Sequence, residues 1–274
     1  MVIDIPKHIE EIIINQAKEL GITVSELIVQ KFTQPQIYRN VKTLNGYLTP
    51  FPNIDTIFVE HQSWLKEHFL PLISIDLGMI NSEWGGQVVH MINPFEPEDG
   101  VIGGWTDEFH NEFTGENWLA FKLTDDNRYE FLGNEGYFIR SPIHGDEVNE
   151  SFEKDIAKSI KKYQAIKEFY AKNGYLADNW NAKSDDETER ENWLESVGGE
   201  LENNAGNWSS DLEMPQAFFG DWDDDEGLII SHNDNPFYFI ASVPAYNYGC
   251  DGADWIVLLY EPISKIVLFT FDWT

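Results

Sequence analysis

The last 47 residues are the segment that most narrows the possible folds of this chain. Four short apolar runs follow one another there, at 228–231, 237–243, 255–260 and 265–273. Each has the length of a strand and is bounded by Gly, Asn, Asp or Pro, which favour turns. The stretch 261–264 is short enough for a tight connection, so we predict an antiparallel meander. Alternation places Val267, Phe269 and Phe271 on one face, which we expect to be the buried one.

A long amphipathic helix over residues 149–172 is the second clear element. Its apolar residues recur at helical spacing, and Asn173-Gly174 supplies a stop with a glycine suited to a left-handed cap. A further helix is expected over 54–69, and between residues 70 and 132 short apolar runs alternate with turn residues. The chain is therefore predicted to be an α+β protein with mainly antiparallel sheets, a helical N-terminal arm and one long helix.

Composition suggests three parts along the chain. We expect a helical arm over residues 1–33, an α+β domain over 34–172, and an acidic loop region with the meander over 173–274. From Asn173 to the end there are 21 acidic and 3 basic residues, which marks this part off. A short helix is expected at 187–196. The alternative is that 34–172 and 173–274 form one continuous unit, with the long helix packed on the sheet.

The charge balance excludes two classes of partner. The chain has 48 acidic and 18 basic residues, a formal charge of −30. Nucleic acid and anionic membranes attract positive proteins, so we expect neither as a partner. We read no secretory leader and no apolar run long enough to span a bilayer. Cys250 is the one cysteine and cannot form an internal disulfide, which is typical of a reducing compartment. We expect a cytoplasmic protein.

Known catalytic motifs are missing from the sequence. It contains no HExxH, no GxSxG, no P-loop and no GxGxxG. The spacing of Asp221, Asp223 and Asp225 matches the start of a calcium loop. However, Glu226 stands where the turn needs glycine, and His232 stands where a bidentate glutamate belongs. We therefore predict no enzyme activity, no metal and no cofactor. A hydrolase with an unrecognised carboxylate site stays open as an alternative.

The N-terminal segment IDIPKHIEEIIINQAKELGITVSELIVQKF, residues 3–32, has a distinctive order of elements. A strand-like start ends at Pro6, a helical pattern follows to a break at Gly21, and a second helical pattern opens at Ser25. This order resembles the ribbon-helix-helix family. The resemblance implies a homodimer paired through residues 1–33, and a DNA-reading strand. Asp4 in that strand would repel phosphates, so dimerisation is expected rather than DNA binding. A plain helical hairpin packed on the body is the alternative.

Residues 44–125 are similar in order to the SUKH superfamily, which holds fungal cell-wall-assembly regulators and many bacterial immunity proteins. The matching features are a helix with Trp64, Leu70-Pro71-Leu72, Gly85-Gly86, Asn93-Pro94, Asp99-Gly100-Val101-Ile102, and Trp105 followed by acidic residues. The resemblance implies an α+β fold with an antiparallel sheet, no enzyme activity and a protein partner.

These observations indicate a binding protein for a basic partner. Nuclease toxins are basic because they bind phosphates, and a carboxylate surface can imitate that backbone and steer the encounter. Tryptophans among the acids would supply anchors. The candidate partner-binding residues are Trp105, Asp107, Glu108, Asp221, Trp222, Asp223, Asp224, Asp225 and Glu226.

We therefore expect a non-enzymatic protein of the immunity or antitoxin type that neutralises a basic toxin. Two alternatives are a dimeric ribbon-helix-helix regulator and the hydrolase named above. For the candidate residues themselves, the competing interpretation is that both tryptophans belong to the core and the acids are a solvated rim.

Overall fold

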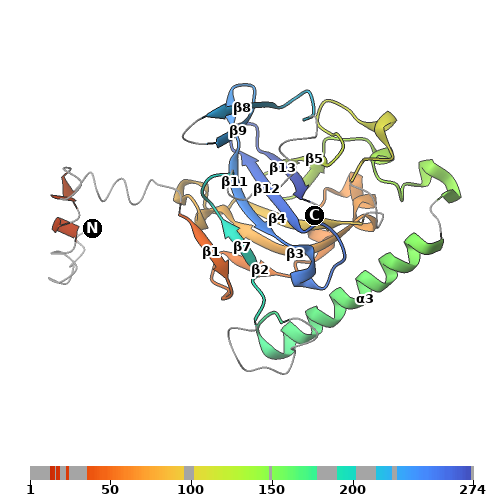
Figure 1. The fold of residues 1–274 in the computed structure, drawn as a ribbon, viewed down its shortest axis with the longest axis horizontal. Coiled ribbons are helices and arrows are strands. Elements are labelled where there is room, and N and C mark those ends of the chain that lie inside the picture. Colours follow the sequence, from red (N-terminus) through yellow and green to blue (C-terminus); the bar gives the residue numbers. More distant parts are fainter. Residues whose placement is uncertain are drawn as a thin grey trace.

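The computed structural model describes residues 13–15, 17–18, 23–24, 36–95, 102–147, 150–177, 190–201, 214–223 and 227–272. It is an α+β protein with mostly antiparallel sheets, which confirms the predicted class (Figure 1). The strands are β1 Tyr38–Val41, β2 Leu48–Pro50, β3 Phe69–Asp76, β4 Val88–Pro94, β5 Trp118–Leu123, β6 Tyr129–Phe131, β7 Leu194–Val197, β8 Phe219–Asp223, β9 Gly227–His232, β10 Asn235–Pro236, β11 Tyr238–Val243, β12 Trp255–Glu261 and β13 Ile266–Asp272.

The longest described helix is α3, Glu150–Asn173, close to the predicted bounds. The remaining helical pieces are short 3-10 turns: η1 Ile54–Thr56, η2 Glu60–Glu67, η3 Leu77–Met79, η4 Ser82–Trp84, η5 Asp107–Phe109, η6 Glu135–Tyr137, η7 Pro142–Glu147 and η10 Ala245–Tyr248. In the arm, residues 13–15 and 17–18 are helical. Most of the predicted ribbon-helix-helix arm lies outside the described residues.

One predicted helix was only partly right and one was wrong. Residues 54–69 form the 3-10 turns η1 and η2 and the start of β3 instead of one continuous helix, and Gln62 leaves helical geometry where its side chain binds β6. Its side-chain amide donates to the Phe131 carbonyl at 3.0 Å, and its Oε1 accepts from the Phe131 N–H at 2.7 Å. The described part of 187–196 includes the start of β7, where pairing with β1 and β11 outweighs the local helical preference.

Seven strands form the central sheet in the order β1-β7-β11-β12-β13-β5-β6. The predicted meander is present as β11-β12-β13, with antiparallel pairing from Trp255↔Asp272 to Glu261↔Ile266. β13 then pairs with β5, so strands from both sides of residue 173 share one sheet. The first predicted strand of the series, at 228–231, is β9 and belongs instead to a separate sheet ordered β10-β9-β8.

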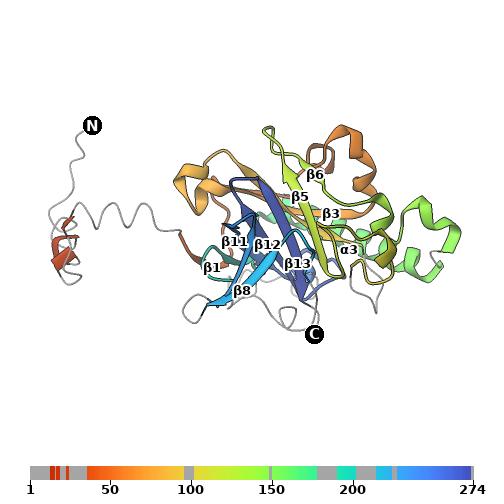
Figure 2. The ribbon, with the colours of Figure 1, turned by 90° about the horizontal axis from the view of Figure 1, so that it is seen from above.

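Both faces of the central sheet are buried. Val267, Phe269 and Phe271 join the main core with the third sheet, β2-β3-β4. Ile266 and Leu268 on the opposite face join a second core that includes residues of the β8–β9 hairpin. The prediction of a single buried face was therefore incomplete, because alternation along β13 cannot reveal a layer contributed by residues 214–237. Figures 1 and 2 show β8 and β9 lying over the central strands.

Helix α3 packs along one side of these layers (Figure 1). Tyr163 and Ile166 enter the main core, and the Tyr163 hydroxyl donates to the Pro71 carbonyl of β3 at 2.5 Å. Lys162 pairs with Asp251 at 2.6 Å and fixes the loop after η10. Among the described residues, no helix is long and apolar enough to cross a membrane.

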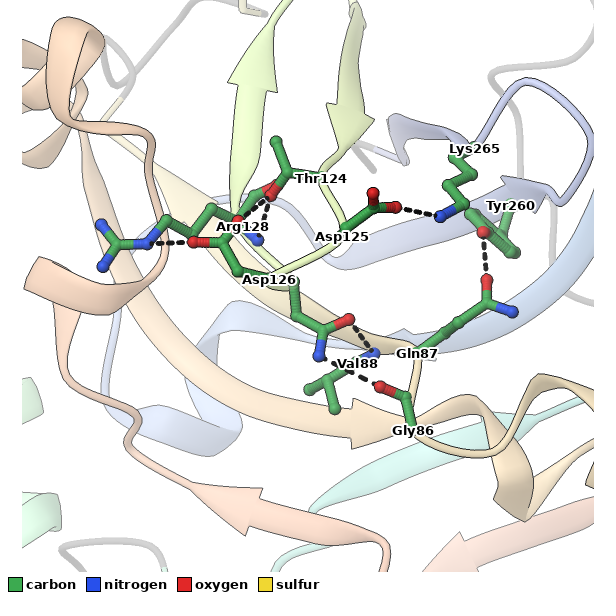
Figure 3. Close-up of polar contacts among 10 residues, drawn as sticks. Gly86, Gln87, Val88, Thr124, Asp125, Asp126, Arg128, Tyr260 and Lys265 are labelled. Carbon is green, nitrogen blue, oxygen red and sulfur yellow. Dashed lines mark hydrogen bonds and ion pairs between the residues drawn. The ribbon is translucent and has the colours of Figure 1, made fainter.

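A polar junction ties three hairpins together at one end of the sheet (Figure 3). The Tyr260 hydroxyl donates to Gln87 Oε1 at 2.5 Å, and Lys265 Nζ binds Asp125 Oδ1 at 2.6 Å. Asn127 accepts from the Val88 N–H and donates to the Gly86 carbonyl, both at 3.0 Å. These bonds hold the β5–β6 and β12–β13 turns against the start of β4.

Candidate functional site

Trp105 is displayed on the surface by a firmly held loop. Its side chain is 63% exposed, although its neighbour Thr106 is 2% exposed. The Thr106 hydroxyl donates to the Tyr137 carbonyl at 2.7 Å, and Ile102 is buried in the core. His110 closes the loop from the other side, with its Nε2 2.9 Å from the Gly103 carbonyl. Trp105 is therefore not a core residue, and it stands on a loop anchored at both ends.

Gly103 explains how the loop reaches this position. It has φ +76°, and a Cβ there would lie 2.6 Å from the ring of Tyr137. A side chain at this position would force the loop off the Tyr137 ring. The Tyr137 hydroxyl itself donates to the carbonyls of Gly115 and Trp118, so the ring is fixed in turn.

The acids predicted beside Trp105 are also on the surface. Asp107 and Glu108 begin the single turn of η5 and are exposed. Glu112 and Glu116 are exposed further along the same segment. Residues 102–121 contain four acids and no Lys or Arg. This part of the surface is consequently anionic, with an exposed tryptophan within it.

The second predicted group lies on and after β8. Asp221 is exposed, and Trp222 is paired in register with Leu228 of β9. Asp223 ends the strand, while Asp224, Asp225 and Glu226 lie outside the described residues. The structure adds Phe219, which is 67% exposed on the same strand. Asp221 and Phe219 are two residues apart on β8, so they share its outer face.

A backbone hydrogen bond joins the two predicted groups. The Ala217 N–H donates to the Glu112 carbonyl at 2.8 Å. Glu112 lies four residues after Glu108, and Ala217 lies four residues before Asp221. Phe113 also packs against Phe218 with ring centroids 6.1 Å apart. The segments carrying Trp105 and Phe219 are thus neighbours in space. We name the exposed residues Trp105, Asp107, Glu108, Glu112, Phe219 and Asp221 the acidic-aromatic surface.

Sequence reasoning missed Phe219 and Glu112, each for its own reason. Phe218-Phe219 is a pair of identical aromatics, and only the register of β8 decides which one faces the core. Phe218 is 6% exposed and belongs to the second core, while Phe219 faces outward. Glu112 carries no local signal beyond its charge.

Ser74 and His90 form the one hydroxyl–imidazole pair among the described hydrogen bonds. Ser74 Oγ lies 2.8 Å from His90 Nδ1, and His90 Nε2 lies 2.8 Å from the Asn127 carbonyl. Both side chains are buried, and burial lowers the pKa of His90 to about 4 despite the opposing hydrogen bond to Asn127. The pair links β3 and β4 to the β5–β6 turn in a place closed to substrate.

Metal and thiol chemistry find little support in the described chain. Among these residues, no group of three or more His, Cys, Asp or Glu side chains is placed to hold a metal ion. Residues 224–226 of the loop compared with a calcium site lie outside them. Cys250 is buried, and burial raises the pKa of its thiol well above the usual range, which disfavours the reactive thiolate.

Comparisons with protein-family models, with curated proteins and with solved structures found no match. The functional argument therefore rests on the geometry of the chain itself.

Proposed function

We propose that this chain is a non-enzymatic binding protein of the immunity or antitoxin type, which neutralises a basic protein by docking through the acidic-aromatic surface. The observation that carries the proposal is the display of Trp105, 63% exposed, on an anchored loop beside exposed carboxylates. Exposed large aromatics in a polar rim are typical of protein-docking sites. An anchored loop also loses little conformational entropy on binding.

The uneven charge of the molecule supports a docking direction. Six of the 18 basic residues lie on α3, namely Lys154, Lys158, Lys161, Lys162, Lys167 and Lys172. Figure 1 shows α3 at the lower edge of the molecule and β8 at the upper edge. α3 also carries four acids, Glu150, Glu153, Asp155 and Glu168, so its net charge is +2. A cationic partner is therefore attracted less to the α3 side than to the acidic-aromatic surface. Such a field orients the encounter and raises the association rate.

The test begins by capturing a binding partner from lysate of the source cells at low salt, and then purifies that partner. Association with the purified partner is measured by surface plasmon resonance from about 50 to about 500 mM salt. The association rate should fall at least about tenfold, because screening removes steering between exposed charges. Trp105→Ala should mainly speed dissociation, since it removes a packed anchor. The complex should also suppress the activity of the partner.

Tyr246→Ala is the matched control for Trp105→Ala. Tyr246 is also 63% exposed and also lies near acids, including Glu195 and Asp254. Tyr246→Ala should leave the dissociation rate unchanged. The proposal would be contradicted if the association rate did not change with salt concentration. It would also be contradicted if Tyr246→Ala weakened the complex and Trp105→Ala did not.

The two alternative functions stay as hypotheses. The ribbon-helix-helix arm predicts that deleting residues 1–33 converts a dimer to a monomer, which light scattering would measure. A carboxylate hydrolase needs two acids facing one cavity. The described pocket is lined by a single carboxylate, Glu200, so it does not favour that reading.

A further inference from the structure

A pocket of about 720 Å³ opens beside the N-terminal end of β11. It contains none of the acidic-aromatic surface residues named above, although its lining residue Ile229 pairs in register with Asp221. Its inner wall contains Ile80, Ile230, Phe239 and Leu259, each no more than 4% exposed. Its mouth is formed by exposed residues that include Ile37 and Tyr238. The volume falls in the range of roughly 300–1,000 Å³ typical of small-molecule sites.

The early end of β7 produces this pocket. β7 pairs with β11 only at Ala241 and Ser242, and the Gly198 N–H then reaches the Ile240 carbonyl at 2.9 Å. Gly198 has φ +67°, and a Cβ there would lie 2.3 Å from the Gln36 carbonyl oxygen. The chain therefore turns away at this glycine instead of continuing along β11.

The space left beside β11 connects the two cores. The pocket touches Ile80 of the main core, and Phe239 and Leu259 of the second core. Its lining therefore includes side chains from both cores.

The lining selects against charged ligands. Among the lining residues, all of which are described, Glu200 alone has a charged side chain, and it is exposed at the mouth. Arg39 lies beside Gly199 at the same rim, where its guanidinium donates to the carbonyls of Tyr38 and Gly198 at 3.1 and 3.2 Å. An ionised group inside would lose hydration without gaining a partner. An anion would also meet Glu200 and the net charge of −30.

We propose that this pocket is a binding site for a small, uncharged and predominantly apolar molecule. The site shares no residue with the acidic-aromatic surface and takes a different class of ligand, so either proposal can fail alone. A tail lies against Phe239 and Leu259, which are cross-strand neighbours on β11 and β12, and a neutral polar end stays at the mouth near Tyr238. An uncharged hydroxyl or ester suits that end better than a carboxylate of the same length.

The probe for the test is Nile red, an uncharged dye whose fluorescence rises in apolar surroundings, titrated into the full chain. We expect one bound dye per chain. Decanol and decanoate, which share tail length and differ in charge at pH 8, then compete for the site. Decanol should displace the dye at a concentration at least about tenfold lower than decanoate does. Equal displacement by the two, or stronger displacement by decanoate, overturns the proposal.

Substitutions at the mouth assign the dye to this pocket. Ile37→Glu and Pro236→Glu change exposed lining residues, so both variants should fold, as circular dichroism would check. Each should weaken dye binding at least about tenfold. Ile263→Glu is the matched control, because Ile263 is 74% exposed in the β12–β13 turn and outside the pocket. Dye binding that none of the variants changes, or that all three change alike, shows that the dye binds elsewhere and overturns the proposal.

Discussion

Acid should destabilise this protein through His90, and the size of the effect follows from its surroundings. The imidazole is held between Ser74 Oγ and the Asn127 carbonyl, each at 2.8 Å, and the ring packs on Tyr129. Burial lowers its pKa from 6.5 to about 4, so the folded state keeps His90 neutral where the unfolded chain takes up a proton. The contribution of His90 to the free energy of unfolding is therefore complete above pH 6.5 and is lost as the pH falls from 6.5 to about 4.

The magnitude comes from the difference between the two pKa values. Each pH unit in this window costs about 1.4 kcal/mol, because one proton is bound by the unfolded chain and not by the folded one. Between pH 7.5 and pH 5 the loss from His90 is about 2 kcal/mol. Burial, and then the charge of Arg140, lower the pKa of His68 to about 4 as well, so His68 adds a similar loss. Together they remove a large part of the ~5–15 kcal/mol typical of a domain.

Urea unfolding followed by tryptophan fluorescence at several pH values measures this loss. The 48 carboxylates titrate in a nearby range, so the informative quantity is the difference between wild type and His90→Gln. The glutamine amide can still donate to the Asn127 carbonyl but does not titrate. The variant should be less stable at pH 7.5 and should lose about 2 kcal/mol less than wild type on going to pH 5. Parallel curves with a constant offset would refute the reasoning.

Two further predictions concern buried polar groups. Within the described residues the buried Thr270 hydroxyl has no hydrogen-bond partner, so Thr270→Val should stabilise the fold by about 1 kcal/mol in urea unfolding. Thr106→Val loses the hydrogen bond to the Tyr137 carbonyl and should destabilise the fold by about 1–2 kcal/mol in the same assay. If both substitutions shift stability in the same direction, the role of the hydroxyl bonds is misassigned. The buried carboxylate of Glu261 accepts from the Ile263 and Ser264 N–H groups at 2.5 and 2.7 Å. Glu261→Ala should therefore cost about 3 kcal/mol and Glu261→Gln less, by thermal or urea unfolding, and equal losses would contradict this.

Local sequence patterns predicted the regular elements well where neighbouring residues decide them. The apolar stripe of α3 and the runs that became β11, β12 and β13 carry their own periodicity, and the tight turn after Glu261 carries turn residues. The same reasoning missed the break in the helix at 54–69, where Gln62 contacts the distant Phe131. A partner about seventy residues away leaves no trace in a local window.

The sequence by itself determined the acid excess, the α+β class, and the placement of lysines along α3. Only the tertiary structure decided which side chains face solvent. Trp105 is exposed because Thr106 and His110 anchor its loop, and Phe219 is exposed because the register of β8 turns Phe218 inward. The pocket beside β11 likewise exists because Gly198 ends the pairing of β7. Exposure and concavity arise from contacts between distant segments, and a pattern of neighbouring residues contains no information about those contacts.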